Sequence, residues 1–370
     1  MREIRPLTGL RGVFAAWIVL GHFWTPAVPQ FPRLVELARP ALGGSLVVDT
    51  FFVLSGFIIT YIYAERMTTF SWAGTRDFWR HRFARIYPVY ALSLALFIAF
   101  VAITQRLTDP PIPSVVIEPG SIIRNALFLH SLPDGMVINP PAWSLPGEVV
   151  AYALFPVLVL AVVRIPKAWI AFGLAALVAV AGASLIAATY TDDFGYSLYE
   201  LSWMRAGWAF PAGCLLARGW MLLGDRGRSP AWDVIAGIGF AGLFGAIMTG
   251  HPTPTLYLPP AGLPFLCLVV VGCAGASGWV ARALSGRVVV WGGRISYSIY
   301  LTHYVVFLVY VEIVRRNDIA TSAFAVRVGV LVLALTAVVA LGAAFYHLVE
   351  EPARRAISRP RRAPAVSSHA

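Results

Sequence analysis

The stretch Arg5–His22 reads RPLTGLRGVFAAWIVLGH, and it decides how the rest of the chain is interpreted. From Leu7 onward its residues are apolar or small, apart from Arg11 and His22, which is typical of a helix that crosses a bilayer. Similar segments recur along the 370 residues, of which 58% are hydrophobic and only 13% are charged. A soluble domain carries roughly 25% charged residues. The composition therefore excludes an ordinary soluble globular protein.

Ten segments are apolar enough to be membrane spans, each of which needs about 20 residues. The sequence therefore predicts an all-α integral membrane protein, a bundle of about ten transmembrane helices in one domain covering 1–352. Residues 353–370 are predicted to be a basic, disordered cytoplasmic tail. The predicted spans are 7–24, 42–63, 88–104, 146–163, 168–189, 203–223, 232–249, 257–277, 295–314 and 324–347.

The distribution of Lys and Arg sets the orientation. If the N-terminus lies inside the cell, the inner segments hold 21 of the 29 Lys and Arg residues and the outer loops hold 6. This excess follows the positive-inside rule, so both termini are predicted to be cytoplasmic. It also accounts for most of the formal net charge of +11 without a nucleic-acid partner.

Arg11 and His22 are eleven residues apart. On a helix that spacing is about 1100°, close to three full turns, so both side chains point the same way, about 16 Å apart along the axis. An ionisable group at the depth of His22 is costly and suggests a functional site. The alternative is a histidine that hydrogen-bonds a neighbouring helix, with Arg11 reaching the headgroups.

Further polar residues stand at the ends of later spans. Asp49 begins an Asp-Thr-Phe-Phe-Val-Leu-Ser-Gly-Phe stretch, where a helix N-cap is the alternative to catalysis. Arg82 and Arg85, in a predicted cytoplasmic loop, are three residues apart and would share a helix face. Their guanidinium groups, beside aromatic residues, can hold phosphates and stack on a purine, although positive-inside anchoring also explains them.

The fourth span opens with Trp-Ser-Leu-Pro-Gly-Glu, which contains Ser144 and Glu148. Glu148 either pairs with Arg205 or orients His22. The stretch Ser-Tyr-Ser-Ile-Tyr-Leu-Thr-His carries Tyr300 and His303, and a hydrogen bond between helices is the alternative to a functional role of His303. Near the C-terminus, Glu350 and Arg354 are spaced for an ordinary i,i+4 pair.

Two outer loops and the cysteines complete the inventory. The loop 105–145 is long and Pro-rich, and such loops are usually functional or disordered. The loop 190–202 combines carboxylates with tyrosines, which suits a polyhydroxylated ligand but is also common in plain loops. Cys214, Cys267 and Cys273 lie in apolar stretches and are predicted to be buried hydrophobes, not metal ligands.

Six motifs occur in one order: Arg-x10-His, Asp-x-Phe-Phe-Val-Leu-Ser-Gly-Phe, Arg-x-x-Arg-Ile-Tyr-Pro, Trp-Ser-Leu-x-x-Glu, Ser-Tyr-Ser-Ile-Tyr-Leu-x-His and Glu-x-Pro. Each is weak alone, but together they resemble the acyltransferase-3 family of bacterial integral-membrane O-acyltransferases, from Arg5 to about Arg355. Some members of that family carry an extracytoplasmic SGNH-type domain, which this chain lacks, so we expect a stand-alone enzyme.

The resemblance implies a multi-pass protein of the bacterial cytoplasmic (inner) membrane, surrounded by membrane lipids. It implies transfer of an acetyl or other short acyl group from cytoplasmic acetyl-CoA, or another acyl-CoA, to a hydroxyl. The acceptor would be a carbohydrate, lipid-linked or free, such as an exopolysaccharide or O-antigen, or alternatively a macrolide. No metal and no nucleic acid are expected, and the sequence specifies no oligomeric state.

Within that chemistry, His22 is the candidate general base, with a covalent acyl-histidine as an alternative. Arg82 and Arg85 are candidates for the phosphates, Arg11 for holding the donor, and Glu148 for setting the His22 tautomer. Other candidates are Asp49, Ser144, Tyr300, His303 and Glu350. A transporter or flippase, and a non-catalytic partner of a polysaccharide export machine, remain alternatives.

Overall fold

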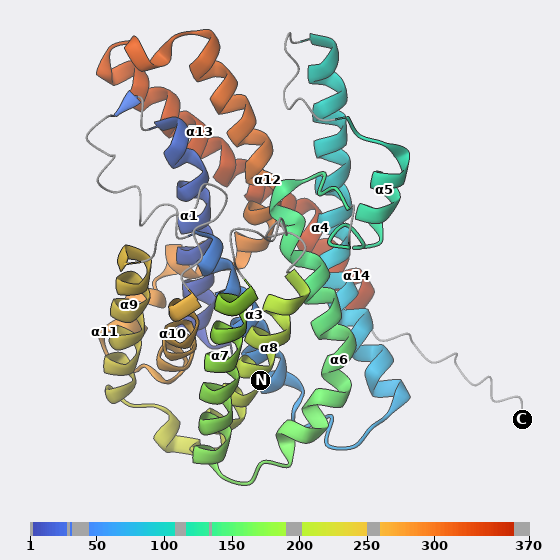
Figure 1. Ribbon diagram of the computed structural model, residues 1–370, viewed down its shortest axis with the longest axis vertical. Coiled ribbons are helices and arrows are strands. Elements are labelled where there is room, and N and C mark those ends of the chain that lie inside the picture. The colour runs from blue at the N-terminus through green and yellow to red at the C-terminus, as the bar shows by residue number, and fades with distance from the viewer. Residues whose placement is uncertain are drawn as a thin grey trace, which may run out of the picture.

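The computed structural model describes residues 3–27, 30–31, 44–107, 116–132, 135–189, 202–249 and 260–358. Most residues in these ranges are helical and none of them lies in a strand, which confirms the all-α prediction (Figure 1). The long helices are α1 (Arg5–Ala27), α3 (Gly44–Tyr63), α4 (Trp72–Leu107), α6 (Leu145–Val163), α7 (Ala168–Thr189), α8 (Ser202–Leu222), α9 (Ala231–Thr249), α10 (Leu263–Gly275), α12 (Arg287–Arg316) and α13 (Phe324–Phe345). The short ones are α5 (Pro119–Ala126), η3 (Pro140–Ser144), η4 (Gly224–Gly227), η5 (Pro260–Gly262), α11 (Trp279–Leu284), η6 (Ile319–Thr321), η7 (Tyr346–Glu350) and α14 (Glu351–Ser358).

Every one of the ten predicted spans overlaps one of the long helices. Among the described residues, eight helices are long and apolar enough to cross a membrane. The two that fall short are α10, which has 13 residues, and α8, whose polar side chains include Arg205 and Arg218. Many large apolar side chains on the long helices are exposed, for example Leu154, Leu177 and Leu333, as expected of surfaces that face lipid.

Close helix crossings are built on glycine. α1 packs along α12, and α3 packs along α8. A Cβ atom added to Gly293 of α12 would lie 1.7 Å from the carbonyl oxygen of Thr8 on α1. At the second crossing, Cβ atoms on Gly56 and Gly213 would each lie 2.0 Å from a backbone oxygen of the facing helix. Lipid supplies no hydrophobic drive between helices, so such close backbone contact is a main source of their association.

Helix α4 is longer than the sequence suggested. It spans 36 residues and continues through Pro88, so it is about 54 Å long at 1.5 Å per residue. The prediction placed Arg82 and Arg85 in a loop before a span at 88–104, and this was wrong. Both residues lie on the helix itself, in a portion that precedes the apolar segment.

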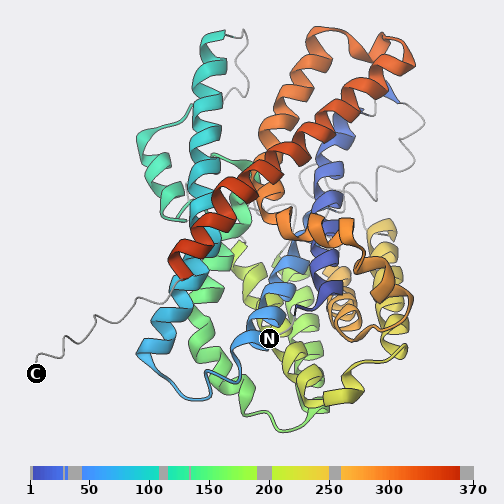
Figure 2. The same cartoon turned by 180° about the vertical axis from the view of Figure 1, so that it is seen from behind.

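The C-terminal part of the described chain returns to α4. After α13 the backbone makes one π-helical turn, η7, and continues as α14 (Figure 2). α14 lies against α4. Residues 353–358, predicted to belong to a disordered tail, are therefore helical and packed, because their helix has a partner surface. Residues 359–370 lie outside the described range.

In the described part of the segment between α4 and α6, side chains hydrogen-bond to the backbone. The Asn125 side chain donates to the Met136 carbonyl at 2.7 Å and accepts from the Ile138 amide at 3.2 Å. The buried ring of His130 contacts the Ala142 carbonyl at 3.1 Å, and burial lowers the pKa of His130 below its usual value. Within 105–145, the described residues thus include helices α5 and η3 and several turns, where the sequence predicted a long Pro-rich loop. The predicted ligand loop at 190–202 lies outside the described residues except for Ser202.

Candidate active site

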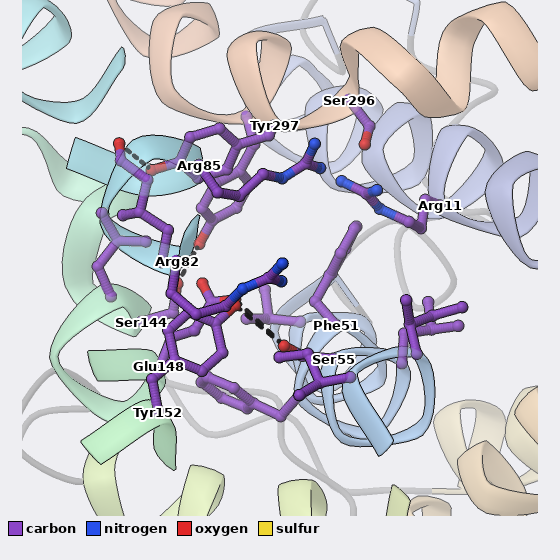
Figure 3. Close-up of a pocket in the computed structure, with 18 of the residues that line it drawn as sticks. Arg11, Phe51, Ser55, Arg82, Arg85, Ser144, Glu148, Tyr152, Ser296 and Tyr297 are labelled. Carbon is purple, nitrogen blue, oxygen red and sulfur yellow. Dashed lines mark hydrogen bonds between the residues drawn. The ribbon is translucent and has the colours of Figure 1, made fainter. Parts of the chain in front are cut away.

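A cavity of about 330 Å³ lies where α1, α3, α4, α6, α12 and α14 meet. Its residues come from segments that are far apart in the sequence, and four arginines are among them. Figure 3 shows the guanidinium groups of Arg11, Arg82 and Arg85 directed into the same space. The lining includes Arg11, Phe51, Ser55, His81, Arg82, Arg85, Ser144, Glu148, Tyr152, Ser296, Tyr297, Tyr300 and Arg354.

Arg82 and Arg85 are held in different ways. The Arg82 guanidinium carbon lies over the Tyr63 ring at 5.7 Å and over the Phe78 and Tyr152 rings at 5.9 Å. Arg85 forms an ion pair with Glu350, Nη1 to Oε1, at 3.1 Å. Glu350 is fully buried and also accepts a hydrogen bond of 2.8 Å from Ser298. The predicted pair of Glu350 with Arg354 is therefore wrong, because the π-helical turn directs Glu350 at Arg85.

Glu148 belongs to the cavity but not to either predicted partner. It accepts hydrogen bonds from Tyr152, one helical turn further on, and from Ser55 of α3 at 3.4 Å. Ser55 and Tyr152 also share a hydrogen bond of 3.1 Å. Neither the Arg205 pair nor the contact with His22 that the sequence suggested is present.

Ser144 and Tyr300 close the cavity on another side. Their hydroxyl groups lie 3.1 Å apart and share a hydrogen bond, and both residues are buried. Ser144 comes from η3, just before α6, and Tyr300 from α12. The bond therefore links the two helices whose motifs the sequence singled out.

His22 and His303 do not line the cavity. Instead they contact each other between α1 and α12, with His303 Nε2 3.3 Å from His22 Nδ1 and ring centroids 5.0 Å apart. The pair is one turn beyond the cavity wall, because His303 Nδ1 contacts the carbonyl of the lining residue Tyr300 at 2.8 Å. On α1, Arg11 thus lines the cavity, whereas His22 lies in the neighbouring contact with His303.

Asp49 lies away from the cavity. It is a fully buried residue inside α3, and its Oδ1 is 2.8 Å from Nε of the buried Arg205 on α8. The Arg205 guanidinium carbon also lies 4.6 Å from the centre of the Trp143 ring. The N-cap interpretation is therefore wrong, since Asp49 joins two helices.

Sequence reasoning missed several cavity residues. Arg354 was considered only as a partner of Glu350, yet it lines the cavity from α14. Tyr152 was not considered, although its position four residues after Glu148 places it on the same helix face. Ser55, although part of the Asp-x-Phe-Phe-Val-Leu-Ser-Gly-Phe motif, and His81 were given no role, because only the packing of α3 and α4 brings them to the cavity. All three cysteines are buried and free, as predicted.

Together, the helical bundle and the cavity lined by four arginines define a polytopic membrane protein with a strongly basic internal cavity. A family model described as an acyltransferase domain matches residues 5–346. The chain therefore belongs to the acyltransferase-3 family, as the six motifs predicted, and it is an acyltransferase.

Three relatives are similar to the chain, and the names of two of them describe an acyltransferase or O-acetyltransferase. The chain is 28% identical to acyltransferase MdmB of Streptomyces mycarofaciens, over 96% of this chain and 92% of the relative. It is 32% identical to protein 2 in the picA locus of Rhizobium radiobacter, over 40% of this chain and 78% of the relative. It is 25% identical to the putative peptidoglycan O-acetyltransferase YrhL of Bacillus subtilis, over 85% of this chain and 51% of the relative. The chain thus spans about half the length of YrhL. No solved structure matches the chain.

Proposed function

We propose that this protein transfers an acetyl or other short acyl group from cytoplasmic acyl-CoA to a hydroxyl of a carbohydrate or related acceptor. The observation that carries the proposal is the convergence of Arg11, Arg82, Arg85 and Arg354 on one cavity. Such a cluster suits a ligand with several phosphate charges, because guanidinium groups bind phosphate through paired, charge-assisted hydrogen bonds. Coenzyme A carries three phosphates and a purine.

The donor enters this site from the end of the bundle that we assign to the cytoplasm, in the inner membrane of a bacterium. The aromatic rings beside Arg82 offer a surface on which a purine can stack. Arg11 then holds the donor further along. From Arg11 to His22 is about 16 Å along the helix, which is comparable with the reach of an extended acyl-pantetheine arm. The thioester would thus pass the Ser144–Tyr300 bond to approach His22.

In the transfer itself, His22 acts as general base. It takes the proton of the acceptor hydroxyl while the hydroxyl oxygen attacks the thioester carbonyl carbon. The bond between that carbon and sulfur then breaks, and the coenzyme A thiolate leaves and takes the proton back from His22. The similarity to YrhL supports a glycan hydroxyl as the acceptor, because the name of that relative describes a putative peptidoglycan O-acetyltransferase. A small molecule such as a macrolide is the second acceptor class, and MdmB, named only as an acyltransferase, is compatible with it.

The test is release of coenzyme A by purified protein given acetyl-CoA and candidate acceptors. The wild type is expected to release thiol only when an acceptor is present. His22→Ala should lower kcat by about 10²- to 10⁴-fold, the usual range for loss of a general base. Arg82→Ala should instead raise the KM for acetyl-CoA.

Two results would contradict the proposal. Wild-type turnover in a folded His22→Ala variant would exclude His22 as the base. Movement of a glycan across the membrane without acylation would indicate a transporter.

A further inference from the structure

The two histidines that contact each other between α1 and α12 are also tied to backbone carbonyls of their own helices. His22 Nδ1 lies 2.9 Å from the Ile18 carbonyl oxygen. His303 Nδ1 lies 2.8 Å from the Tyr300 oxygen and 3.2 Å from the Ile299 oxygen. The Nδ1 atom of each ring is therefore committed to a carbonyl one turn earlier.

These contacts fix the protons on the neutral rings. A carbonyl oxygen can only accept, so Nδ1 of each ring must carry the hydrogen and donate it. A neutral imidazole has one N–H, so Nε2 of each ring is unprotonated. His303 Nε2, 3.3 Å from His22 Nδ1, is therefore the acceptor in the contact between the rings. His22 Nδ1 donates to two acceptors, Ile18 and His303.

We propose that His303 is a positioning residue for His22: its unprotonated Nε2 accepts the Nδ1–H of His22 and so leaves Nε2 of His22 as the proton-accepting atom. The inference rests on the proposed function, in which His22 is the base. It assigns to a neutral histidine the task that a carboxylate performs in the Ser-His-Asp triad. The sequence had assigned this task to Glu148, whose recorded hydrogen bonds are to Ser55 and Tyr152.

The proton balance is simple. When the acceptor hydroxyl gives its proton to His22 Nε2, the ring becomes an imidazolium with hydrogen on both nitrogens. The Nδ1–H bonds to His303 Nε2 and the Ile18 oxygen then become charge-assisted and stronger. His22 returns its Nε2 proton to the leaving thiolate, and His303 keeps its own proton on Nδ1 throughout. In the described chain, no carboxylate hydrogen-bonds either ring, so this relay carries no net negative charge in the membrane.

The rings around the pair hold this geometry. Tyr304 lies edge-on to His22 with centroids 5.5 Å apart, and Phe307 does so at 6.1 Å. His303 itself is fully buried. The pair therefore has little freedom to reorient, and loss of the acceptor on His303 should act on the chemical step more than on substrate binding.

The test compares substitutions at His303 by kcat and KM in the coenzyme A release assay. His303→Leu removes the acceptor and should lower kcat by roughly 10- to 100-fold, the worth of one hydrogen bond to a charged group, with the KM for acetyl-CoA unchanged. His303→Gln can place a carbonyl oxygen near the position of Nε2 and should restore most of the rate. Thr302→Val is the matched control: it removes a buried hydrogen bond of the same helix, to Ser298, and should leave kcat within about twofold.

The outcomes separate the inference from the function on which it rests. Equal kcat in wild type, His303→Leu and His303→Gln would overturn the positioning role, and so would equal losses in Leu and Gln. Wild-type kcat in His22→Ala would instead overturn the proposed base. If His303→Leu does not fold, His303→Asn replaces it, because its side-chain oxygen lies near the position of Nδ1 and cannot reach His22. It should show the same loss in kcat.

Discussion

Among the described residues, Arg205 is the most buried arginine that forms an ion pair, and its carboxylate partner lies on another helix. Its side chain is 1% exposed, and that of its partner Asp49 is fully buried. Burial of two charges is expensive, and their attraction rarely repays more than that cost. The pair therefore joins α3 to α8 in a specific register without adding much stability, and the neighbouring Trp143 ring favours the cation.

We expect the double substitution of this pair to cost much less stability than the single substitution. Arg205→Met should lower the free energy of unfolding by about 3–5 kcal/mol, because Asp49 then remains buried without its partner. The double variant Asp49→Leu/Arg205→Met should recover most of that loss. The measurement is thermal unfolding in detergent, arranged as a double-mutant cycle.

An additive cycle, in which the double variant is as unstable as the sum of the singles, would show that the two charges do not interact. A double variant that is stable yet inactive would instead assign Asp49 or Arg205 a part in the reaction.

The sequence identified the polar residues of the bundle but not their partners. Asp49, Glu148 and Glu350 were each singled out as candidate site residues, and Glu148 also as costly in an apolar helix, which follows from residue type and depth. Their partners lie 93 to 265 positions away, on Arg205, Ser55 and Arg85. Such pairs depend on how helices rotate against each other, and one sequence carries no direct signal of that rotation.

The crossing of helices α1 and α12 positions both histidines, His22 on α1 and His303 on α12. Their axes approach closely because Gly12 and Gly293 lack side chains, and a Cβ atom on either of them would be within 3 Å of the facing backbone. The distance between His22 and His303 therefore depends on residues about three turns away from them along the same helices. Spacing within the motifs could not reveal this dependence.

Neighbouring glycines of α12 provide a matched test. Gly293→Ala should destabilise the protein and lower kcat, because the new methyl group meets the Thr8 oxygen and moves α12 away from α1. Gly292→Ala places the same methyl group where no heavy atom lies within 4 Å, so it should keep full activity and stability. Thermal unfolding and coenzyme A release measure the two effects.

Equal behaviour of the two variants would show that the crossing of α1 and α12 tolerates separation. A Gly293→Ala variant that is unstable but fully active at low temperature would show that the crossing stabilises the protein without positioning the histidine pair.

For α4, by contrast, there is a physical reason why the sequence predicted only the part of the helix after Pro88. Hydropathy marks the part of a helix that lies in lipid, and the basic portion of α4 before Pro88 failed that criterion. A helix that protrudes from the membrane is invisible to this kind of analysis. The placement of Arg82 and Arg85 on one helix face was nevertheless predictable from their spacing.

At the scale of the whole molecule, the orientation of the bundle decides which substrate enters from which side. The arginine distribution predicts that the start of α4 lies in the cytoplasm and the turn between α12 and α13 lies outside. The native cysteines are all buried, so a polar thiol reagent has little access to them. Single cysteines at exposed positions can therefore report the orientation.

We expect Ala323→Cys, in the turn before α13, to react with a membrane-impermeant maleimide in intact cells. Ser71→Cys, just before α4, should react only after the membrane is permeabilised. Both native residues are exposed, so accessibility within the protein does not limit either reaction. The reverse pattern would place the arginine cavity on the outer side and exclude cytoplasmic acyl-CoA as its ligand.

The π-helical turn before α14 has a consequence for biosynthesis. Glu350 anchors Arg85, and Arg354 lines the cavity, so two contributions to the arginine site come from residues that the ribosome adds after all ten long helices. A nascent chain can therefore insert its membrane helices in full before α14 completes the arginine-lined cavity. Ribosomes that stop early, at a codon before Arg354, would release a well-inserted protein that competes for membrane space but does not hold a donor in the completed site.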